Sequence, residues 1–163
     1  MTESFVIGSP IGFIKVRLDN DQLSSIEFVD SPKLLAPSSA YGKKTEFQLK
    51  SYFNNPDFTF DISIKKQGTE FQQKVWAALQ EIPKGSVMTY GELAKKLHSS
   101  ARAIGNACRR NPTPVVVPCH RIVAASGLGG FAGATSGQLT DIKQHLLKLE
   151  GVQFSTQLEL NQV

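Results

Sequence analysis

The sequence has few cysteines and no long apolar run. Cys108 and Cys119 are the only cysteines among 163 residues, too few for the disulfide framework of a small secreted domain. No stretch approaches the about 20 apolar residues that a membrane-spanning helix needs, and the first residues lack the basic and apolar character of a signal peptide. We therefore expect free thiols, no membrane association and a cytoplasmic protein.

Patterns typical of metal and cofactor sites are also missing. The two cysteines and three histidines do not have the spacing of zinc ligands, so no metal site is expected. Residues 127–132 match the dinucleotide pattern G-x-G-x-x-A, but more loop follows and no strand–helix–strand unit can be completed around them. We therefore expect no nucleotide and no other cofactor.

What the sequence does have is a mild excess of positive charge and enough apolar residues for a core. The formal net charge is +4, which favours a polyanionic partner without requiring one. Hydrophobic residues make up 40% of the chain, which suffices for one ordinary domain or two small ones.

The first part of the chain predicts a small α/β domain over residues 1–67. Apolar and polar residues alternate in several short segments, which is typical of an antiparallel sheet with one buried face. A stretch rich in proline and serine separates these segments from a helical pattern. The predicted order is strands at 5–7, 13–18 and 25–29, a loop at 31–44, a helix at 45–53 and a last strand at 58–64.

From Gly68 onward the period of the apolar residues becomes helical, and we place a second, mainly helical domain over residues 68–163. A last helix through Ile142 and Leu149 is expected to end at Glu150-Gly151, with the glycine as its C-cap. Earlier in this domain, a short amphipathic segment around Leu93, the turn and N-cap Ser99-Ser100 and a helix at 101–110 outline a helix-turn-helix. Two packed core helices with no further function would give the same pattern.

The second of these helices is thin and basic. Alanine and glycine occupy much of it, which suits close approach to another backbone or to a narrow DNA groove. Arg102, Arg109 and Arg110 could contact phosphates or bases. They could equally form a solvated face.

Cys119 is the candidate nucleophile. Three prolines surround the apolar run 115–117, which predicts a strand that mounts Cys119 rigidly. A lone cysteine is more often simply packed. However, His120 and Arg121 supply a base and a positive charge, which a thiol with an ordinary pKa of about 8.5 needs in order to react as a thiolate near neutral pH. Cys108 is expected to pack, while exposed His98 and His145 have no role.

Several motifs occur together in one order between residues 68 and 151, and in this they resemble the O6-alkylguanine-DNA alkyltransferase family, also called methylated-DNA–protein-cysteine methyltransferases. The first half is similar to the family only in outline. The motifs are Phe71-x-x-x-Val75-Trp76, Thr89-Tyr90-Gly91-Glu92-Leu93-Ala94, Ala101-Arg102-Ala103-Ile104-Gly105, Asn111-Pro112, Pro118-Cys119-His120-Arg121-Ile122-Val123, a glycine-rich loop, and Leu146-Leu147-x-x-Glu150-Gly151.

The resemblance implies an α/β amino-terminal ribonuclease-H-like domain with an antiparallel sheet, and a mainly α carboxy-terminal domain with a winged helix-turn-helix. It implies repair of duplex DNA by one irreversible alkyl transfer from O6-alkylguanine, and also O4-alkylthymine, to Cys119. The base would first flip out of the helix. His120 and Glu150 would take the thiol proton through a water molecule, and Asn111 would be a hinge between the recognition helix and the active site.

The same resemblance implies roles in DNA and substrate binding. Arg102 would fill the gap left by the flipped base, entering from the minor groove, beside Ala101 and with Arg109 as a further contact. Tyr90 would crowd a phosphate and donate a proton toward the leaving base. A monomer is expected, with cooperative assembly on DNA left open. The substrate pocket would include Gly130, Phe131, Ala132, Gly133 and Lys143.

Two departures and three alternatives accompany this reading. Ala132 replaces a serine that many members have, and residues 134–141 lengthen the segment before the last helix. A DNA-binding module without chemistry would lack the cysteine. A helix-turn-helix regulator would bind a specific sequence without Cys119, and a cysteine hydrolase would turn over.

Overall fold

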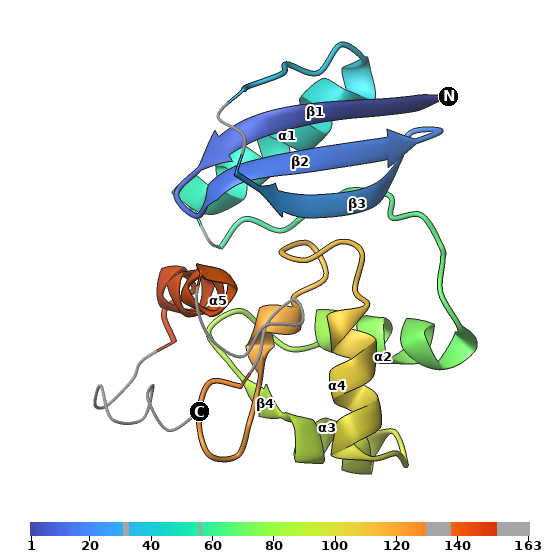
Figure 1. The fold of residues 1–163 in the computed structure, drawn as a ribbon, viewed down its shortest axis with the longest axis vertical. Helices are drawn as coiled ribbons and strands as arrows, with labels where there is room; N and C mark the ends of the chain where they lie inside the picture. Colours follow the sequence, from blue (N-terminus) through green and yellow to red (C-terminus); the bar gives the residue numbers. More distant parts are fainter. Residues whose placement is uncertain (31–32, 56, 130–137, 153–163) are drawn as a thin grey trace. The chain divides into compact units, whose positions relative to one another are not determined.

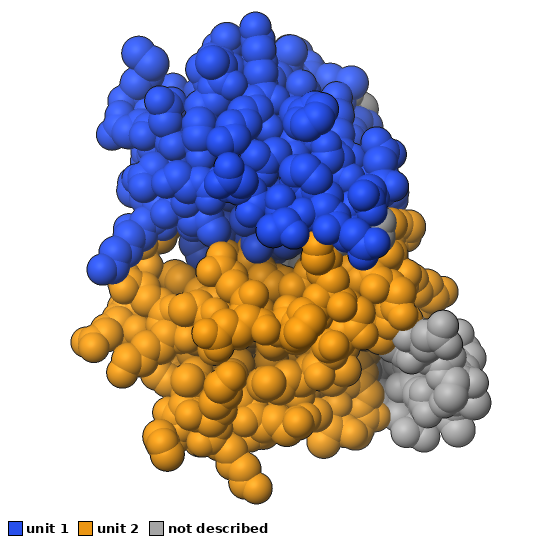
Figure 2. Space-filling model, turned by 180° about the vertical axis from the view of Figure 1, so that it is seen from behind, with its two compact units in different colours: residues 1–66, 112–116 blue, residues 67–111, 117–163 orange. Residues whose placement is uncertain are grey.

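The computed structural model describes residues 1–30, 33–55, 57–129 and 138–152 (Figure 1). The chain forms two compact units, one of residues 1–66 with 112–116 and one of residues 67–111 with 117–163 (Figure 2). Segment 112–116 groups with the first unit because its backbone bonds to the sheet there: the Ile26 amide donates to the Pro112 carbonyl at 2.9 Å. The two domains predicted over residues 1–67 and 68–163 are continuous ranges, so they do not place segment 112–116 with the first unit.

The first unit contains a three-stranded antiparallel sheet in the order β1-β2-β3. Its strands are β1 (Thr2–Ser9), β2 (Gly12–Asp19) and β3 (Gln22–Val29). Asn20 and Asp21 form the β2–β3 turn with φ of 48° and 60°, the left-handed conformation that a two-residue hairpin turn of this kind requires. The three strands predicted from alternation are confirmed, and each is longer than predicted.

Helix α1 (Ala40–Asn54) packs against this sheet, with its contacts falling mainly on β1. The prediction of a loop up to residue 44 is wrong, because Ser39 caps a helix that begins at Ala40; the Ser39 hydroxyl accepts from the Gly42 amide at 2.9 Å. From the sequence alone, Gly42 in this first turn indicates a loop. The core between sheet and helix is made by Phe5, Ile14, Val16, Leu23, Leu49, Tyr52 and Phe53.

The predicted strand at 58–64 is also wrong. Only Ile64 pairs with a strand residue there, in an isolated parallel bridge to Leu23. The Gln48 side chain takes the place of a strand partner: its Nε2 donates to the Asp61 carbonyl at 3.1 Å and its Oε1 accepts from the Asp61 amide at 2.8 Å. A side chain thus satisfies backbone groups that alternation alone assigned to a ladder.

The second unit is mainly helical. Helix α4 contacts both α2 and α3, and Trp76 Nε1 of α2 donates to the Ala107 carbonyl of α4 at 2.9 Å. Strands β4 and β5 form a short parallel pair. The elements are α2 (Glu70–Gln80), β4 (Met88–Thr89), α3 (Tyr90–Lys96), α4 (Ala101–Arg109), the 3-10 turn η1 (Cys119–Arg121), β5 (Ile122–Val123) and α5 (Gln138–Leu149).

Side-chain caps define where the two helices of the predicted helix-turn-helix begin. Thr89 and Glu92 form a reciprocal capping box at the start of α3. Ser100 caps α4, its hydroxyl accepting from the Ala103 amide at 3.1 Å. The predicted helix pair and its serine cap are confirmed. Among the described residues, no helix has the length and apolar character needed to cross a membrane.

Candidate active site

The backbone before Cys119 is a tight turn, and the strand predicted at 115–117 is wrong. Val115 and Val116 form the turn, and Val115 has φ of 76°, a conformation that β-branched residues rarely adopt. The three valines are nevertheless buried. The neighbouring prolines lack the backbone donors that a strand ladder needs, so they favour turns over pairing.

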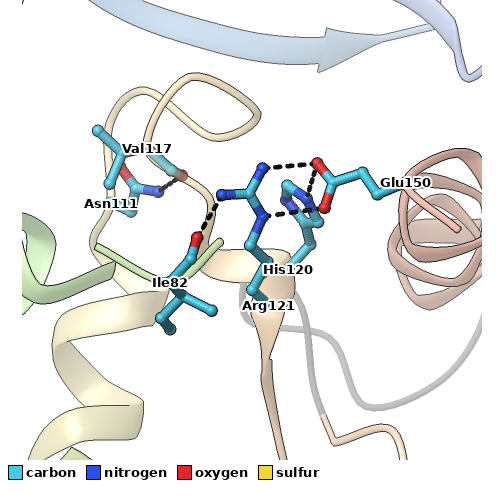
Figure 3. A network of polar contacts seen from close by, with 6 residues as sticks. All are labelled: Ile82, Asn111, Val117, His120, Arg121 and Glu150. Carbon is cyan, nitrogen blue, oxygen red and sulfur yellow. Dashed lines mark hydrogen bonds and ion pairs between the residues drawn. The ribbon is translucent and has the colours of Figure 1, made fainter. Parts of the chain in front are cut away.

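Two hydrogen bonds to the Val117 carbonyl fix the position of Cys119 (Figure 3 shows the one from Asn111). Pro118 has φ of −81° and ψ of 68°, and the Cys119 amide donates to the Val117 carbonyl at 2.8 Å, which is an inverse γ-turn. Asn111 Nδ2 donates to the same carbonyl at 2.9 Å. Since the ring of Pro118 restricts φ to near this value, the turn is preorganised.

The Cys119 thiol is buried, with 6% of the residue exposed. Burial raises its pKa, while a hydrogen bond with Asn111 and the charge of Lys143 act in the opposite direction. The thiol of the free protein therefore keeps its proton at neutral pH. The thiol must lose its proton to a base when it reacts.

Lys143 of α5 supplies the positive charge near the thiol. It is fully buried, its Nζ donates to the Ile122 carbonyl at 2.6 Å, and its ammonium lies 6.0 Å from the centroid of the Tyr90 ring. Burial lowers its pKa to about 8. Cys108 is buried as predicted, and this burial raises its pKa to about 12, so it is a thiol.

His120 lies in the interior against the end of α5. Its Nε2 is 2.9 Å from Glu150 Oε2, and both side chains are fully buried. Burial lowers the pKa of His120 and outweighs the opposing effect of Glu150, so the imidazole is neutral at neutral pH. Nδ1 has no hydrogen-bond partner among the described residues. A neutral ring whose Nε2 donates to the carboxylate presents Nδ1 as an acceptor.

Arg121 binds Glu150, and our expectation that it supplies the charge beside the thiol is wrong. Its Nε and one terminal nitrogen donate to the two carboxylate oxygens at 2.9 and 2.8 Å, and its other terminal nitrogen donates to the Ile82 carbonyl at 2.7 Å (Figure 3). One feature of the sequence could have indicated this role. Arg121 directly precedes the apolar pair Ile122-Val123, which indicates an interior position, and a charged group in the interior requires a partner.

The predicted DNA-contacting residues of α4 lie on its exposed side. Ala101, Arg102 and Arg109 are exposed, as is Arg110 at the end of the helix. Tyr90 begins α3 and is partly buried. Its ring lies close to Gly129, where an added Cβ would come within 3.1 Å of it. The same ring lies close to Gly105 of α4, so Tyr90 lies near both α4 and Gly129.

Other predicted positions contribute less to the site. Gly130, Phe131, Ala132 and Gly133, the expected pocket wall, lie outside the described residues, as does most of the lengthened segment. His98 and His145 are exposed. In the part of the chain that the structure describes, no group of histidine, cysteine, aspartate and glutamate could hold a metal ion.

Comparison with known proteins agrees with the resemblance of the motifs. The family model of the DNA-binding domain of 6-O-methylguanine DNA methyltransferase matches residues 70–152. The methylated-DNA–protein-cysteine methyltransferase of Methanosarcina acetivorans is 40% identical over 155 residues, covering 90% of this chain and 96% of that protein.

Solved structures give the same result. The O6-methylguanine methyltransferase of Mycobacterium tuberculosis is similar with a TM-score of 0.78 at 33% identity, covering 92% of this chain and 93% of that one. The OGT of the same organism in complex with DNA is similar with a TM-score of 0.72 at 32% identity, covering 89% and 90%. The predicted family is confirmed: this chain belongs to the 6-O-methylguanine DNA methyltransferase family.

Proposed function

We propose that this protein repairs DNA by moving the alkyl group of O6-alkylguanine onto the sulfur of Cys119, once per molecule. The observation that carries the proposal is a buried cysteine on a fixed turn, next in sequence to a histidine that contacts a buried carboxylate. The relatives are named for methyl transfer from DNA to a protein cysteine, and one similar structure is a complex with DNA.

The proton of the thiol moves to His120 in this mechanism. Nδ1 of the neutral imidazole accepts it through a bridging water, and Glu150 stabilises the imidazolium that forms. The sulfur then attacks the alkyl carbon in line, so that the S–C bond forms as the C–O6 bond breaks. Tyr90 donates a hydrogen bond toward the base as negative charge develops on it. The restored guanine takes up a proton in place of the alkyl group and remains attached to its DNA strand, while the thioether stays on the protein because water does not hydrolyse it.

Reaching the alkyl group requires the base to leave the helix, which costs a few kcal/mol and less for a lesion that pairs badly. Arg102 fills the gap from the minor groove, Ala101 allows close approach, and Arg109 contacts the backbone. Their exposure on α4 supports these roles. Lys143 of α5 lines the substrate pocket, and Asn111 couples α4 to the turn before Cys119.

The finer description of the fold also belongs to this proposal. Three antiparallel strands followed by a helix support a reduced ribonuclease-H-like domain. The α3–α4 pair with β4 and β5 nearby supports a winged helix-turn-helix. A monomeric state, cooperative assembly on DNA, a cytoplasmic location and action on O4-alkylthymine stay predictions.

Intact-mass measurement tests the function. The protein is incubated with a duplex that contains O6-methylguanine, and we expect one added methyl group on Cys119. Cys119→Ser should gain none, whereas the matched variant Cys108→Ser, at the other buried cysteine, should gain one. An unchanged mass of the parent protein would contradict the proposal. Restoration of more than one lesion by each protein molecule would instead indicate a hydrolase that turns over.

A further inference from the structure

The mechanism above leaves one buried cation without a role, the guanidinium of Arg121. It binds both carboxylate oxygens of Glu150, and both side chains are almost entirely removed from solvent, 10% and 0% exposed. Its remaining terminal nitrogen donates to the Ile82 carbonyl, just after α2. Such a two-point contact fixes the plane of the carboxylate as well as its position.

One carboxylate oxygen has two donors. Glu150 Oε2 accepts from Arg121 at 2.8 Å and lies 2.9 Å from His120 Nε2 (Figure 3). An ionised carboxylate can only accept, so Nε2 must carry the ring proton and Nδ1 must carry the lone pair. A protonated carboxyl group could instead donate to Nε2, and the ring proton would then lie on Nδ1. The ionisation of Glu150 therefore decides which ring nitrogen can accept the proton of the thiol.

We propose that Arg121 is a positioning residue that keeps Glu150 ionised and thereby keeps His120 in the form with its proton on Nε2. This inference rests on the proposed function, because it assigns the arginine a part in the same proton transfer. A buried carboxyl group without a nearby cation is protonated at neutral pH, since burial disfavours the charged form. Without the guanidinium, the ring proton would thus move from Nε2 to Nδ1, and Nδ1 could no longer accept the proton of the thiol.

The charges around His120 are consistent with this assignment. Among the described residues, the charged groups that act on its pKa are Glu150 at the end of α5, Arg121 in η1 and Lys143 in α5. The arginine and the lysine both lower the pKa of His120, and the carboxylate raises it. Lys143 donates to the Ile122 carbonyl, whereas Arg121 donates to both carboxylate oxygens of Glu150.

Nitrogen NMR of the imidazole tests the proposal directly. With labelled histidine, we expect His120 of the parent protein to carry its proton on Nε2 at about pH 6.5, and Arg121→Met to carry it on Nδ1. Arg121→Lys keeps a charge near the carboxylate and should retain the parental form. A parent protein with the proton on Nδ1 would overturn the proposal, and this measurement needs no variant to fold.

The pH profile of alkyl transfer gives the second readout. With free O6-benzylguanine in single-turnover experiments, we expect Arg121→Met to react about 100-fold more slowly than the parent at about pH 6.5, and the deficit to shrink toward about pH 9 as the carboxylate reforms. Arg121→Lys should follow the parental profile closely. A deficit that is equal at every pH and equal in both variants would show a structural role only.

The two proposals fail in distinguishable ways. If the parent protein gains no benzyl group on Cys119, the proposed function is wrong, and the ring-proton measurement still decides the role of Arg121 in the network. If the benzyl group is gained and the ring proton stays on Nε2 in Arg121→Met, the function stands and the inference about Arg121 is overturned.

Discussion

Lys143 sets the electrostatic environment of the Cys119 thiol. Burial raises the pKa of the thiol, and a hydrogen bond with Asn111 and the charge of this buried lysine both lower it; the lysine and the cysteine come from parts of the chain far apart in sequence. From the sequence we expected this positive charge to come from Arg121, because a sequence shows only which residues are adjacent along the chain. The structure shows that Arg121 binds Glu150 instead.

Removal of the lysine charge should slow alkyl transfer. We expect Lys143→Met to react about tenfold more slowly with free O6-benzylguanine at neutral pH, because the thiol pKa rises without the lysine charge and less thiolate forms. The deficit should narrow as the pH rises. Lys148→Met, which removes an exposed lysine of the same helix, is the control and should react normally. A deficit that does not change with pH would contradict this account.

At the scale of the element, the end of α5 determines where Glu150 lies. The amide of Gly151 donates to the Lys148 carbonyl at 3.0 Å and that of Val152 donates to the Leu147 carbonyl at 2.9 Å, which is a Schellman motif. Gly151 has φ of 85°, which favours glycine. The glycine predicted to cap this helix therefore also presents the carboxylate to His120.

Gly151→Ala should lower the free energy of unfolding by about 1 kcal/mol, because alanine is strained at this φ. No atom of the described residues lies within 4 Å of the added methyl group, so we attribute the loss to strain at this φ. Gly91 lies inside α3, where the backbone is helical and an added methyl group has similar space. Gly91→Ala should therefore be neutral or slightly stabilising. Urea unfolding of the three proteins measures the difference. Equal losses for both variants would refute a special role for the φ of Gly151.

Glu3 joins β1 to the start of α1. Its carboxylate accepts four hydrogen bonds from the backbone amides and hydroxyls of Ser38 and Ser39, between 2.5 and 2.9 Å. These bonds, those of the hydroxyls foremost, lower its pKa from 4.5 to about 2. Because the pKa is lower in the folded state than in the unfolded chain, the ionised carboxylate stabilises the fold at pH values above its ordinary pKa. This contribution is lost as the pH falls from about 4.5 through about 2.

In Glu3→Gln, the free energy of unfolding should therefore decrease less than in the parent as the pH falls. We expect the variant to be less stable than the parent by about 2 kcal/mol at neutral pH, a value reduced for the partial exposure of the site, and nearly equal to it at about pH 2. Urea unfolding across this pH range measures the convergence. Glu27→Gln, at an exposed position of β3, should leave the parental dependence on pH intact. Parallel curves for parent and Glu3→Gln would exclude the linkage.

At the scale of the whole molecule, reaction with DNA differs from reaction with a free base. Duplex repair requires the lesion to leave the helix, whereas free O6-benzylguanine needs only the active site. The exposed arginines of α4 lie on the element proposed to meet DNA, and Cys119 lies in a separate buried turn. The two substrates therefore separate DNA recognition from chemistry.

Arg102→Ala should slow repair of a duplex with O6-methylguanine by about 100-fold and leave reaction with free O6-benzylguanine within about twofold of the parent, because only the duplex needs its gap filled. Arg17→Ala, which removes an exposed arginine of β2, is the matched control and should leave both reactions intact. Equal losses on the two substrates would remove the proposed role of Arg102.

The sequence by itself determined the family, the candidate nucleophile and the elements whose signals are local. Three alternating segments, the helix pair and the caps at Ser100 and Gly151 depend on residues close in sequence, so pattern alone predicted them. Two strands were predicted where the backbone forms no ladder with a neighbouring strand. Gln48 satisfies the backbone of the supposed last strand, and prolines turn the supposed strand before Cys119.

Only the tertiary structure decided which charges meet. Burial raises the pKa of Cys119 and lowers that of His120, and both effects depend on packing from distant parts of the chain. The cation that acts on the thiol comes from α5, while the arginine beside the histidine turns to Glu150. Electrostatic interactions act through space and strengthen where water is excluded, and sequence order records neither distance nor burial.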